Sequence, residues 1–311
     1  MLWLLLTACG QYLEAGEALN DPLVTGECDQ ISADVDLPGR EELETATTLG
    51  YYGLSGLLTA HTQLDDWNGG QMRVVDYNAF INTPDAGTTL ADTLSNMSAV
   101  DPLALESEAE AYAFWLNLYN VWTLQAAVNQ IQIDESWVGA SASTWNGEET
   151  GVPFVMFTTR FVQVGGLELS LNEVEHGVMR GYLPPEDYAD EPEVLETLQS
   201  WHDALWKGSA PDALLHVGIN CASRSCPDIG ATAFTAENVY EMLDQNARDF
   251  IKHPGKGAGP DGISTLFNWF RGDFNATFGS VEAFIQTYRE GGDAGVNYDV
   301  YLEYDWEQNA P

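Results

Sequence analysis

The sequence predicts an α+β fold, in which a single mainly helical domain carries a small antiparallel or mixed sheet and a β-hairpin. Three observations lead to this prediction. A chain of 311 residues with 45% hydrophobic and 11% aromatic residues can bury a large core. Residues 106–131 form an apolar run of helical length. Residues 161–169 read FVQV-GG-LEL, which is typical of a hairpin with a Gly-Gly turn.

The chain begins with the apolar stretch MLWLLLTACG, in which residues 6–9 resemble the lipobox of bacterial lipoprotein signals. Residues 1–9 are therefore expected to be a signal, and Cys9 the site of lipidation. This predicts an exported protein of the bacterial cell envelope that is anchored to the membrane through Cys9. Residues 10–45 are expected to be an acidic flexible tether, and residues 46–311 a single domain.

Acidic residues dominate the charge of the chain. It has 48 Asp and Glu against 11 Lys and Arg, for a net charge of −37, and the acids are scattered rather than gathered in a tail. A phosphate backbone would be repelled, so nucleic acid is not an expected partner. The charge fits a solvated acidic surface suited to a salty environment, with a field that attracts cations as the alternative.

The helices follow from apolar periodicity. A first helix is expected over residues 46–64. The run 106–131 is apolar on most faces, so this helix should be buried. Asn117 and Asn120 lie one turn apart on it, and their amides should project from the same side.

A second polar helix face is predicted after the hairpin. Ser170–Glu173 forms a capping box, which predicts a helix from Leu171. His176 and Arg180 lie one turn apart on a side of this helix away from its apolar stripe, so His176 should be displayed on a polar face.

Further along the chain, residues 214–219 resemble a short buried strand that delivers Cys221 to its end. Two more helices are expected over residues 236–252 and 281–289, with a Gly-rich loop at 255–262 after the first.

The stretch HVGINCASRSC, residues 216–226, concentrates one histidine and two cysteines. A disulfide between Cys221 and Cys226 is one interpretation, which leaves Cys28 as an odd thiol if Cys9 is lipidated. The spacing lacks the CxxC or HExxH pattern of a zinc site, so no metal is expected. Nucleotide-binding motifs are also missing from the sequence, and no cofactor is predicted.

Nucleophilic catalysis by Cys221 is another interpretation, and it requires a base within hydrogen-bond reach. On an extended strand His216 would lie roughly 16 Å away and point to the opposite face. The base is therefore expected from elsewhere in the fold, and His176 is the candidate. Asn117 or Asn120 would then orient the imidazole or donate to an oxyanion.

Five blocks of the sequence stand out by their order and spacing. In order they are AFWLNLYNVWTL (113–124), FVQVGGLELSLNEVEHGVMR (161–180), HVGINCASRSCPDI (216–229), LFNWFRGDF (266–274) and LEYDWEQN (302–309). Together they resemble the DUF547 family, over about residues 75–309. The family name denotes an unknown function, so the resemblance implies no activity. Bacterial members of the family are often exported, and some animal members carry a glutaredoxin domain, so the resemblance fits export and a thiol chemistry.

The resemblance also marks a set of polar positions, namely Asn117, Tyr119, Asn120, Glu175, His176, Arg180, His216 and Cys221. Three hypotheses follow. The first is acyl transfer or hydrolysis of an amide, peptide or thioester at Cys221, papain-like only by analogy. The second is thiol–disulfide redox chemistry at Cys221 and Cys226. The third is a non-enzymatic binding or scaffolding domain with a structural polar cluster.

Overall fold

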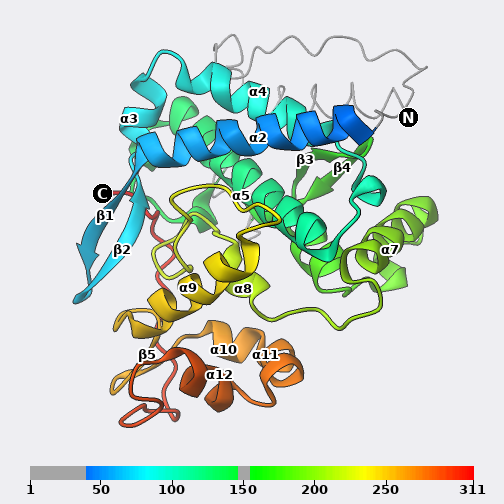
Figure 1. Ribbon diagram of the computed structural model, residues 1–311. Helices are drawn as coiled ribbons and strands as arrows, with labels where there is room; N and C mark the ends of the chain where they lie inside the picture. The colour runs from blue at the N-terminus through cyan, green and yellow to red at the C-terminus, as the bar shows by residue number, and fades with distance from the viewer. Residues whose placement is uncertain (1–39, 146–154) are drawn as a thin grey trace.

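The computed structural model describes residues 40–145 and 155–311 (Figure 1). The predicted lipidation site Cys9, most of the predicted tether and Cys28 lie outside the described residues. The structure confirms a mainly helical α+β fold. In the described residues the strands form three separate two-stranded antiparallel sheets, so they are ribbons attached to a helical body.

The elements follow one another along the chain as a helical body with inserted hairpins (Figure 1). The α-helices are α2 (Arg40–His61), α3 (Tyr77–Asn82), α4 (Ala86–Ser98), α5 (Glu108–Ile133), α6 (Val155–Thr158), α7 (Pro192–Trp206), α8 (Leu215–Gly218), α9 (Val239–Lys252), α10 (Leu266–Trp269), α11 (Arg271–Phe278) and α12 (Val281–Tyr288). The strands are β1 (Thr62–Trp67), β2 (Gly70–Val75), β3 (Arg160–Val164), β4 (Leu167–Ser170), β5 (Ala258–Gly259) and β6 (Gly262–Ile263). The 3₁₀ and π turns are η1 (Pro102–Ala104), η2 (Glu135–Trp137), η3 (Ala142–Thr144), η5 (Glu173–Met179) and η6 (Pro185–Tyr188).

Helix α5 is the centre of the fold, as its apolar sequence predicted. Every residue from Ala111 to Ile131 is buried. The Ser107 side chain caps the helix by accepting a hydrogen bond from the N–H of Glu110 at 3.1 Å. Figure 1 shows α5 running through the body with α2 and α4 stacked along one side. Residues on α5 can therefore reach several layers of the molecule.

The N-terminal part of the described chain corrects the predicted boundaries. Helix α2 begins at Arg40, so residues 40–45 belong to a helix and not to the predicted tether. It ends at His61 because the chain turns there into the β1–β2 hairpin, which the sequence had not indicated.

The predicted hairpin is confirmed as β3–β4. Its turn residues Gly165 and Gly166 have φ angles of +54° and +80°. Glycine adopts this left-handed backbone without the steric cost of a Cβ atom, which explains the Gly-Gly pair.

The predicted capping box at Ser170 and Glu173 is also confirmed. The N–H of Ser170 donates to Glu173 Oε2 at 2.8 Å, and the N–H of Glu173 donates to Ser170 Oγ at 3.1 Å. The helix begins at Leu171 as predicted, but from Glu173 to Met179 it is a π-helix. Its wider turn brings the N–H of Arg180 to the carbonyl of Glu175 at 3.0 Å. Short π-helical turns are frequent at functional sites.

The predicted strand at residues 214–219 is wrong, because Leu215–Gly218 form the short helix α8. A buried apolar run of this length does not distinguish helix from strand. At Gly218 a Cβ atom would lie 2.7 Å from methyl groups of Leu116 and Leu243, so glycine allows α8 to approach α5 and α9 closely. His216 therefore does not lie on an extended strand that points it away from Cys221, as the sequence had predicted.

The C-terminal segment packs against the loop that contains the two cysteines. The N–H of Arg224 donates to the carbonyl of Glu307 at 2.8 Å, and the N–H of Asn309 donates to that of Ala222 at 3.1 Å. Ser225 Oγ accepts from the N–H of Asp305 at 2.8 Å. These contacts join two regions about eighty residues apart in the sequence.

Candidate functional site

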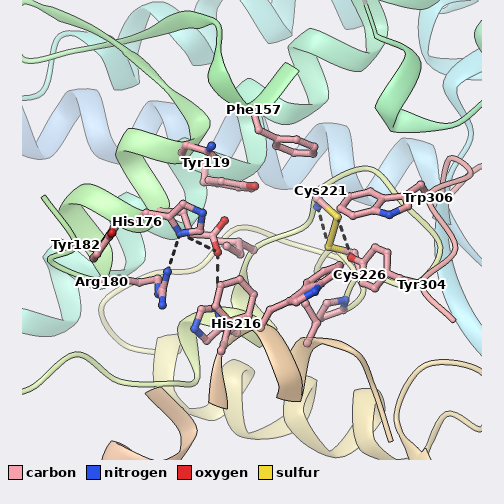
Figure 2. Close-up of a pocket in the computed structure, with 17 residues that line it drawn as sticks. Tyr119, Phe157, His176, Arg180, Tyr182, His216, Cys221, Cys226, Tyr304 and Trp306 are labelled. Carbon is pink, nitrogen blue, oxygen red and sulfur yellow. Dashed lines mark hydrogen bonds and ion pairs between the residues drawn. A yellow bond between two sulfur atoms is a disulfide. The ribbon is translucent and has the colours of Figure 1, made fainter. Parts of the chain in front are cut away.

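A pocket of about 480 Å³ lies between α5, the π-helix η5, the cysteine loop and the C-terminal segment (Figure 2). Aromatic and charged side chains share its wall. Its aromatic lining residues are Tyr119, Phe157, Tyr182, Trp269, Phe270, Tyr304 and Trp306. Its titratable and sulfur-containing lining residues include Glu175, His176, Arg180, His216, Cys221 and Cys226.

Cys221 and Cys226 form a disulfide in the pocket wall, with their Cα atoms 6.1 Å apart. Two hydroxyl groups lie beside the Cys221 sulfur, Ser223 Oγ at 3.1 Å and Tyr304 Oη at 3.3 Å. The N–H of Cys221 donates to the Cys226 sulfur at 3.0 Å. Both sulfurs therefore lie among hydrogen-bond donors, which would stabilise a thiolate after reduction.

The backbone that presents Cys221 is held in an unusual conformation. Ala222 has a φ angle of +59°, which costs a residue with a Cβ atom about 1–2 kcal/mol. The side chain of Asn220 accepts a hydrogen bond from the N–H of Ala222 at 2.9 Å and another from Asn309 Nδ2 at 3.1 Å. Strain of this kind persists where its surroundings fix it, often at functional sites.

His176 projects from the π-helix into the pocket and is hydrogen-bonded to Arg180. Arg180 Nη1 lies 2.9 Å from His176 Nδ1. Because a guanidinium only donates, Nδ1 must accept, and the neutral ring carries its proton on Nε2. Burial, Arg180 and His216 lower the pKa of His176 to about 4. His176 is therefore neutral at pH 7.

A second imidazole is fixed by a carboxylate. His216 is buried in α8, and its Nε2 lies 2.8 Å from Asp273 Oδ2. Asp273 also accepts from Arg180 Nε at 2.6 Å. Burial works to raise the pKa of Asp273, but the hydrogen bonds from His216 and Arg180 outweigh it and hold that pKa well below its usual range. The His216 ring stacks on Phe270, with centroids 3.8 Å apart.

Glu175 lies between the two imidazoles. Its Oε1 is 3.8 Å from Nδ1 of His176 and 3.8 Å from Nδ1 of His216. Tyr119 forms a hydrogen bond with the same carboxyl. Burial raises the pKa of Glu175 to about 7, with a further contribution from Asp273 that Arg180 opposes. Its pKa therefore suits proton transfer near neutral pH.

Asn117 and Asn120 do not line the pocket, and both are buried in hydrogen bonds to backbone. Asn117 Nδ2 donates to the carbonyl of Phe234 at 2.8 Å, and its Oδ1 accepts from the N–H of the same residue at 2.9 Å. Asn120 binds Gly218 and Asn220 in a similar way. Both amides are thereby occupied in holding segments of the fold.

The structure brings most of the predicted site residues into one pocket. These residues are Tyr119, Glu175, His176, Arg180, His216, Cys221 and Cys226. The polar contacts of the His176 ring are to Arg180 and Glu175, whereas the Cys221 sulfur contacts its own loop and Tyr304. Figure 2 shows His176 and Cys221 on different parts of the pocket wall. The predicted pairing of thiol and imidazole stays a prediction.

Sequence reasoning missed Asp273 and Tyr304. Asp273 is in the LFNWFRGDF block and Tyr304 in the LEYDWEQN block, so the blocks were recognised without these side chains being singled out. Single acids in a chain with 48 of them carry little information. Only the three-dimensional contact with His216 distinguishes Asp273.

Neither a metal-binding cluster nor a membrane-spanning helix is found in residues 40–145 and 155–311. No group of three or more His, Cys, Asp or Glu side chains there has a geometry that could hold a metal ion. No helix there combines the length and apolar character needed to cross a bilayer.

Fold and site together define a mainly helical α+β protein with a pocket that combines a disulfide, two imidazoles and a buried carboxyl. Residues 103–251 match the family model described as "Protein of unknown function, DUF547". The predicted resemblance to the DUF547 family is thus confirmed over these residues, a narrower range than the predicted 75–309. No curated protein and no solved structure matches the chain.

Proposed function

We propose that the pocket carries out thiol–disulfide exchange, with Cys221 and Cys226 as its redox pair. The observation that carries the proposal is the disulfide between these two cysteines in the wall of a pocket of about 480 Å³. A partner thiol or disulfide entering that pocket would meet the sulfurs directly. The partner class is a thiol- or disulfide-bearing small molecule or peptide.

Cys221 is the nucleophile in this proposal, because Ser223 and Tyr304 place hydroxyl groups beside its sulfur. In the reduced protein the Cys221 thiolate attacks a partner disulfide, forming a mixed disulfide and releasing one partner thiolate. The Cys226 thiolate then attacks the Cys221 sulfur, which re-forms the internal disulfide and releases the second partner thiolate. Two electrons pass to the partner, and both released thiolates take up protons.

The experiment is a redox equilibrium of the full chain in glutathione and dithiothreitol buffers. Each cysteine is alkylated and identified by peptide mapping, which keeps Cys28 and Cys9 separate from the pair. We expect Cys221 and Cys226 to reduce together at a potential above about −300 mV, the region below which structural disulfides typically lie. A pair that stays oxidised at far lower potentials contradicts the proposal.

A matched pair of tyrosine variants tests the role of the hydroxyl beside the sulfur. Tyr304→Phe removes the hydroxyl 3.3 Å from Cys221 Sγ, whereas Tyr182→Phe removes a hydroxyl from an exposed residue of the same pocket. In the reduced protein, Tyr304→Phe should raise the pKa of Cys221, measured as the pH dependence of iodoacetamide alkylation, because a donor to the thiolate is lost. Tyr182→Phe should leave it unchanged.

Acyl transfer or hydrolysis at Cys221 is the second candidate. The observation that favours it is that the neutral His176 ring lines the same pocket with a proton on Nε2, a donor suited to a developing oxyanion. The reduced protein would then form a covalent acyl adduct at Cys221 with an activated thioester, detected by mass. Cys221→Ser should lose this adduct, and the absence of any adduct in the wild type would exclude the candidate.

The non-enzymatic hypothesis is the third outcome of these tests. Asn117 and Asn120 support a structural role, because their amides are hydrogen-bonded to the backbone. It would hold if the cysteine pair neither exchanges with thiols nor accepts an acyl group.

The proposed location is the bacterial cell envelope, with a lipid anchor on Cys9. The support is the sequence MLWLLLTACG and its resemblance to a lipobox. Metabolic labelling with an alkyne fatty acid in a bacterial host should label the wild type and fail with Cys9→Ser, while Cys28→Ser is the control that keeps the label. Equal labelling of wild type and Cys9→Ser would contradict the anchor.

A further inference from the structure

We propose that Glu175 is the proton-transfer group of the pocket and that His216 and Asp273 position it. The inference deepens the proposed function and rests on it in taking this pocket as the active site. Its geometry involves three elements, namely the π-helix with Glu175, helix α8 with His216 and helix α11 with Asp273.

The orientation of the His216 proton is fixed by Asp273. The Asp273 carboxylate accepts the hydrogen bond from His216 Nε2 at 2.8 Å, so the neutral ring carries its proton there. Its Nδ1 is then a lone-pair acceptor. That atom is buried and makes no hydrogen bond within the described part of the chain, and it lies 3.8 Å from Glu175 Oε1. A buried acceptor of this kind requires a donor.

His176 presents a second unprotonated nitrogen to the same oxygen. Its Nδ1 already accepts from Arg180 with its one lone pair, and it too lies 3.8 Å from Glu175 Oε1. An ionised carboxylate would face two electron-rich nitrogens here, neither at hydrogen-bond distance, whereas the acid form can turn its proton toward the free lone pair of His216. The geometry of the acceptors therefore favours the acid form of Glu175.

The other groups that act on Glu175 oppose one another. Arg180, on the same helix, and the Tyr119 hydroxyl, on α5, favour the carboxylate, whereas burial and Asp273 favour the acid. Tyr304, from the C-terminal segment, is close enough for its pKa to be raised by the Glu175 charge. The balance raises the pKa of Glu175 to about 7, so this group can both give and take a proton at neutral pH.

Tyr304 connects Glu175 to the sulfur chemistry. Its hydroxyl lies 3.3 Å from Cys221 Sγ and within electrostatic range of Glu175. In the exchange reaction Glu175 gives its proton to the first departing partner thiolate. The Glu175 carboxylate then takes the proton of the Cys226 thiol as that sulfur attacks the Cys221 sulfur. This restores the acid form of Glu175. The second departing thiolate is protonated by water.

The first test is the protonation state of Glu175 in the full chain. Carbon-13 labelling of glutamate carboxyls gives signals that titrate, and the signal missing in Glu175→Gln identifies this residue. Glu168→Gln is the necessary companion, because burial also raises the pKa of Glu168 to about 7. We expect the Glu175 signal to titrate with a midpoint near 7. A midpoint near the ordinary value of about 4.3 overturns the proposal.

Nitrogen-15 spectra of the histidines test the positioning residues. At pH 6 both His176 and His216 should be neutral with the proton on Nε2. Asp273→Asn should lower the Glu175 midpoint, because the negative charge that helps to hold its proton is lost. A doubly protonated His216 beside an ionised Glu175 at pH 6 overturns the assignment, as does a Glu175 midpoint that Asp273→Asn leaves unmoved.

The last test uses two disulfide probes that differ in their need for a proton. Oxidised glutathione releases a basic alkyl thiolate, whereas an aromatic disulfide releases a weakly basic one. Glu175→Gln should reduce the ratio of the oxidised-glutathione rate to the aromatic-disulfide rate by about 10²-fold relative to wild type. The reason is that only the alkyl thiolate needs an acid. An unchanged ratio overturns the catalytic role. If the wild type reacts with neither probe, the redox function fails, and the carboxyl titration still decides the protonation of Glu175.

Discussion

Asn120 on helix α5 binds both sides of the segment that leads to Cys221. Its Nδ2 donates to the carbonyl of Gly218 at 2.9 Å, and its Oδ1 accepts from the N–H of Asn220 at 2.8 Å. The buried helix thereby positions the cysteine loop through one side-chain amide. Asn117, one turn earlier, holds Phe234 in the same manner.

Asn120→Ala should lower the free energy of unfolding by about 2–4 kcal/mol, because two buried backbone groups lose their partners. Urea denaturation followed by circular dichroism measures this change. Asn78→Ala, at an exposed position of α3, is the matched control and should change stability by less than about 0.5 kcal/mol. Equal stabilities for the two variants would show that the Asn120 contacts are unimportant.

Removing the carboxylate that pairs with the buried Lys256 should lower the free energy of unfolding. Its Nζ donates to Asp228 Oδ1 at 2.5 Å and to the carbonyl of Cys226 at 2.8 Å, and burial lowers its pKa. Asp228→Asn should cost about 3–5 kcal/mol because the lysine charge stays buried. The double variant Asp228→Asn with Lys256→Met should recover part of that loss in the same denaturation assay. A double variant less stable than the single one contradicts this account.

Gly218→Ala should destabilise the fold by about 1–3 kcal/mol through overpacking, since the new Cβ would meet methyl groups of Leu116 and Leu243 at 2.7 Å. Gly272→Ala is the control in helix α11, where a Cβ meets nothing within 4 Å. There alanine should stabilise the protein by up to about 1 kcal/mol. Thermal unfolding of both variants gives opposite shifts if the close approach at Gly218 is correct.

The stability of Glu175→Gln relative to wild type should rise with pH. The pKa of Glu175 is raised on folding, so its contribution to stability is present below about 4.3 and is lost as the pH rises through about 7. Glutamine has no such loss. The difference in unfolding free energy should grow by up to about 3–4 kcal/mol over this window, measured by urea denaturation at several pH values. A difference that stays constant with pH would contradict the raised pKa.

His176 and His216 change stability in the opposite direction. Both have a pKa lowered to about 4 in the fold, so the stability they contribute is present above about 6.5 and is lost as the pH falls through 4. Because both variants in the comparison above retain these histidines, their contribution largely cancels there. The unfolding free energy of the wild type, measured by itself, should therefore fall on acidification through this range.

The sequence predicted the elements whose local signals are strong. The apolar run of α5, the Gly-Gly turn of β3–β4 and the capping box at Ser170 were each found at their places. These features depend on neighbouring residues only, which a sequence displays directly. Helix α7 was missed, although Pro192 at its first turn is a recognisable start signal.

The sequence predicted most of the residues that line the pocket, but not which of them contact one another. The π-helix could not be expected, because a change from one hydrogen-bond register to another leaves no local pattern. Residues 214–219 were assigned to a strand because four buried apolar positions fit either structure. As a result, the partners of His216 on the distant helix α11 were out of reach of sequence reasoning.

The contacts between the cysteine loop and residues 305–309 have a practical consequence for fragment design. A polypeptide cut at the limits of the family match, 103–251, would omit Asp273, Tyr304 and the strand-like cover over Arg224 and Ala222. The apolar surface exposed on such a fragment would promote aggregation, and its two cysteines would be free to pair between molecules. Expression for biophysical work should therefore retain everything from α2 to Pro311.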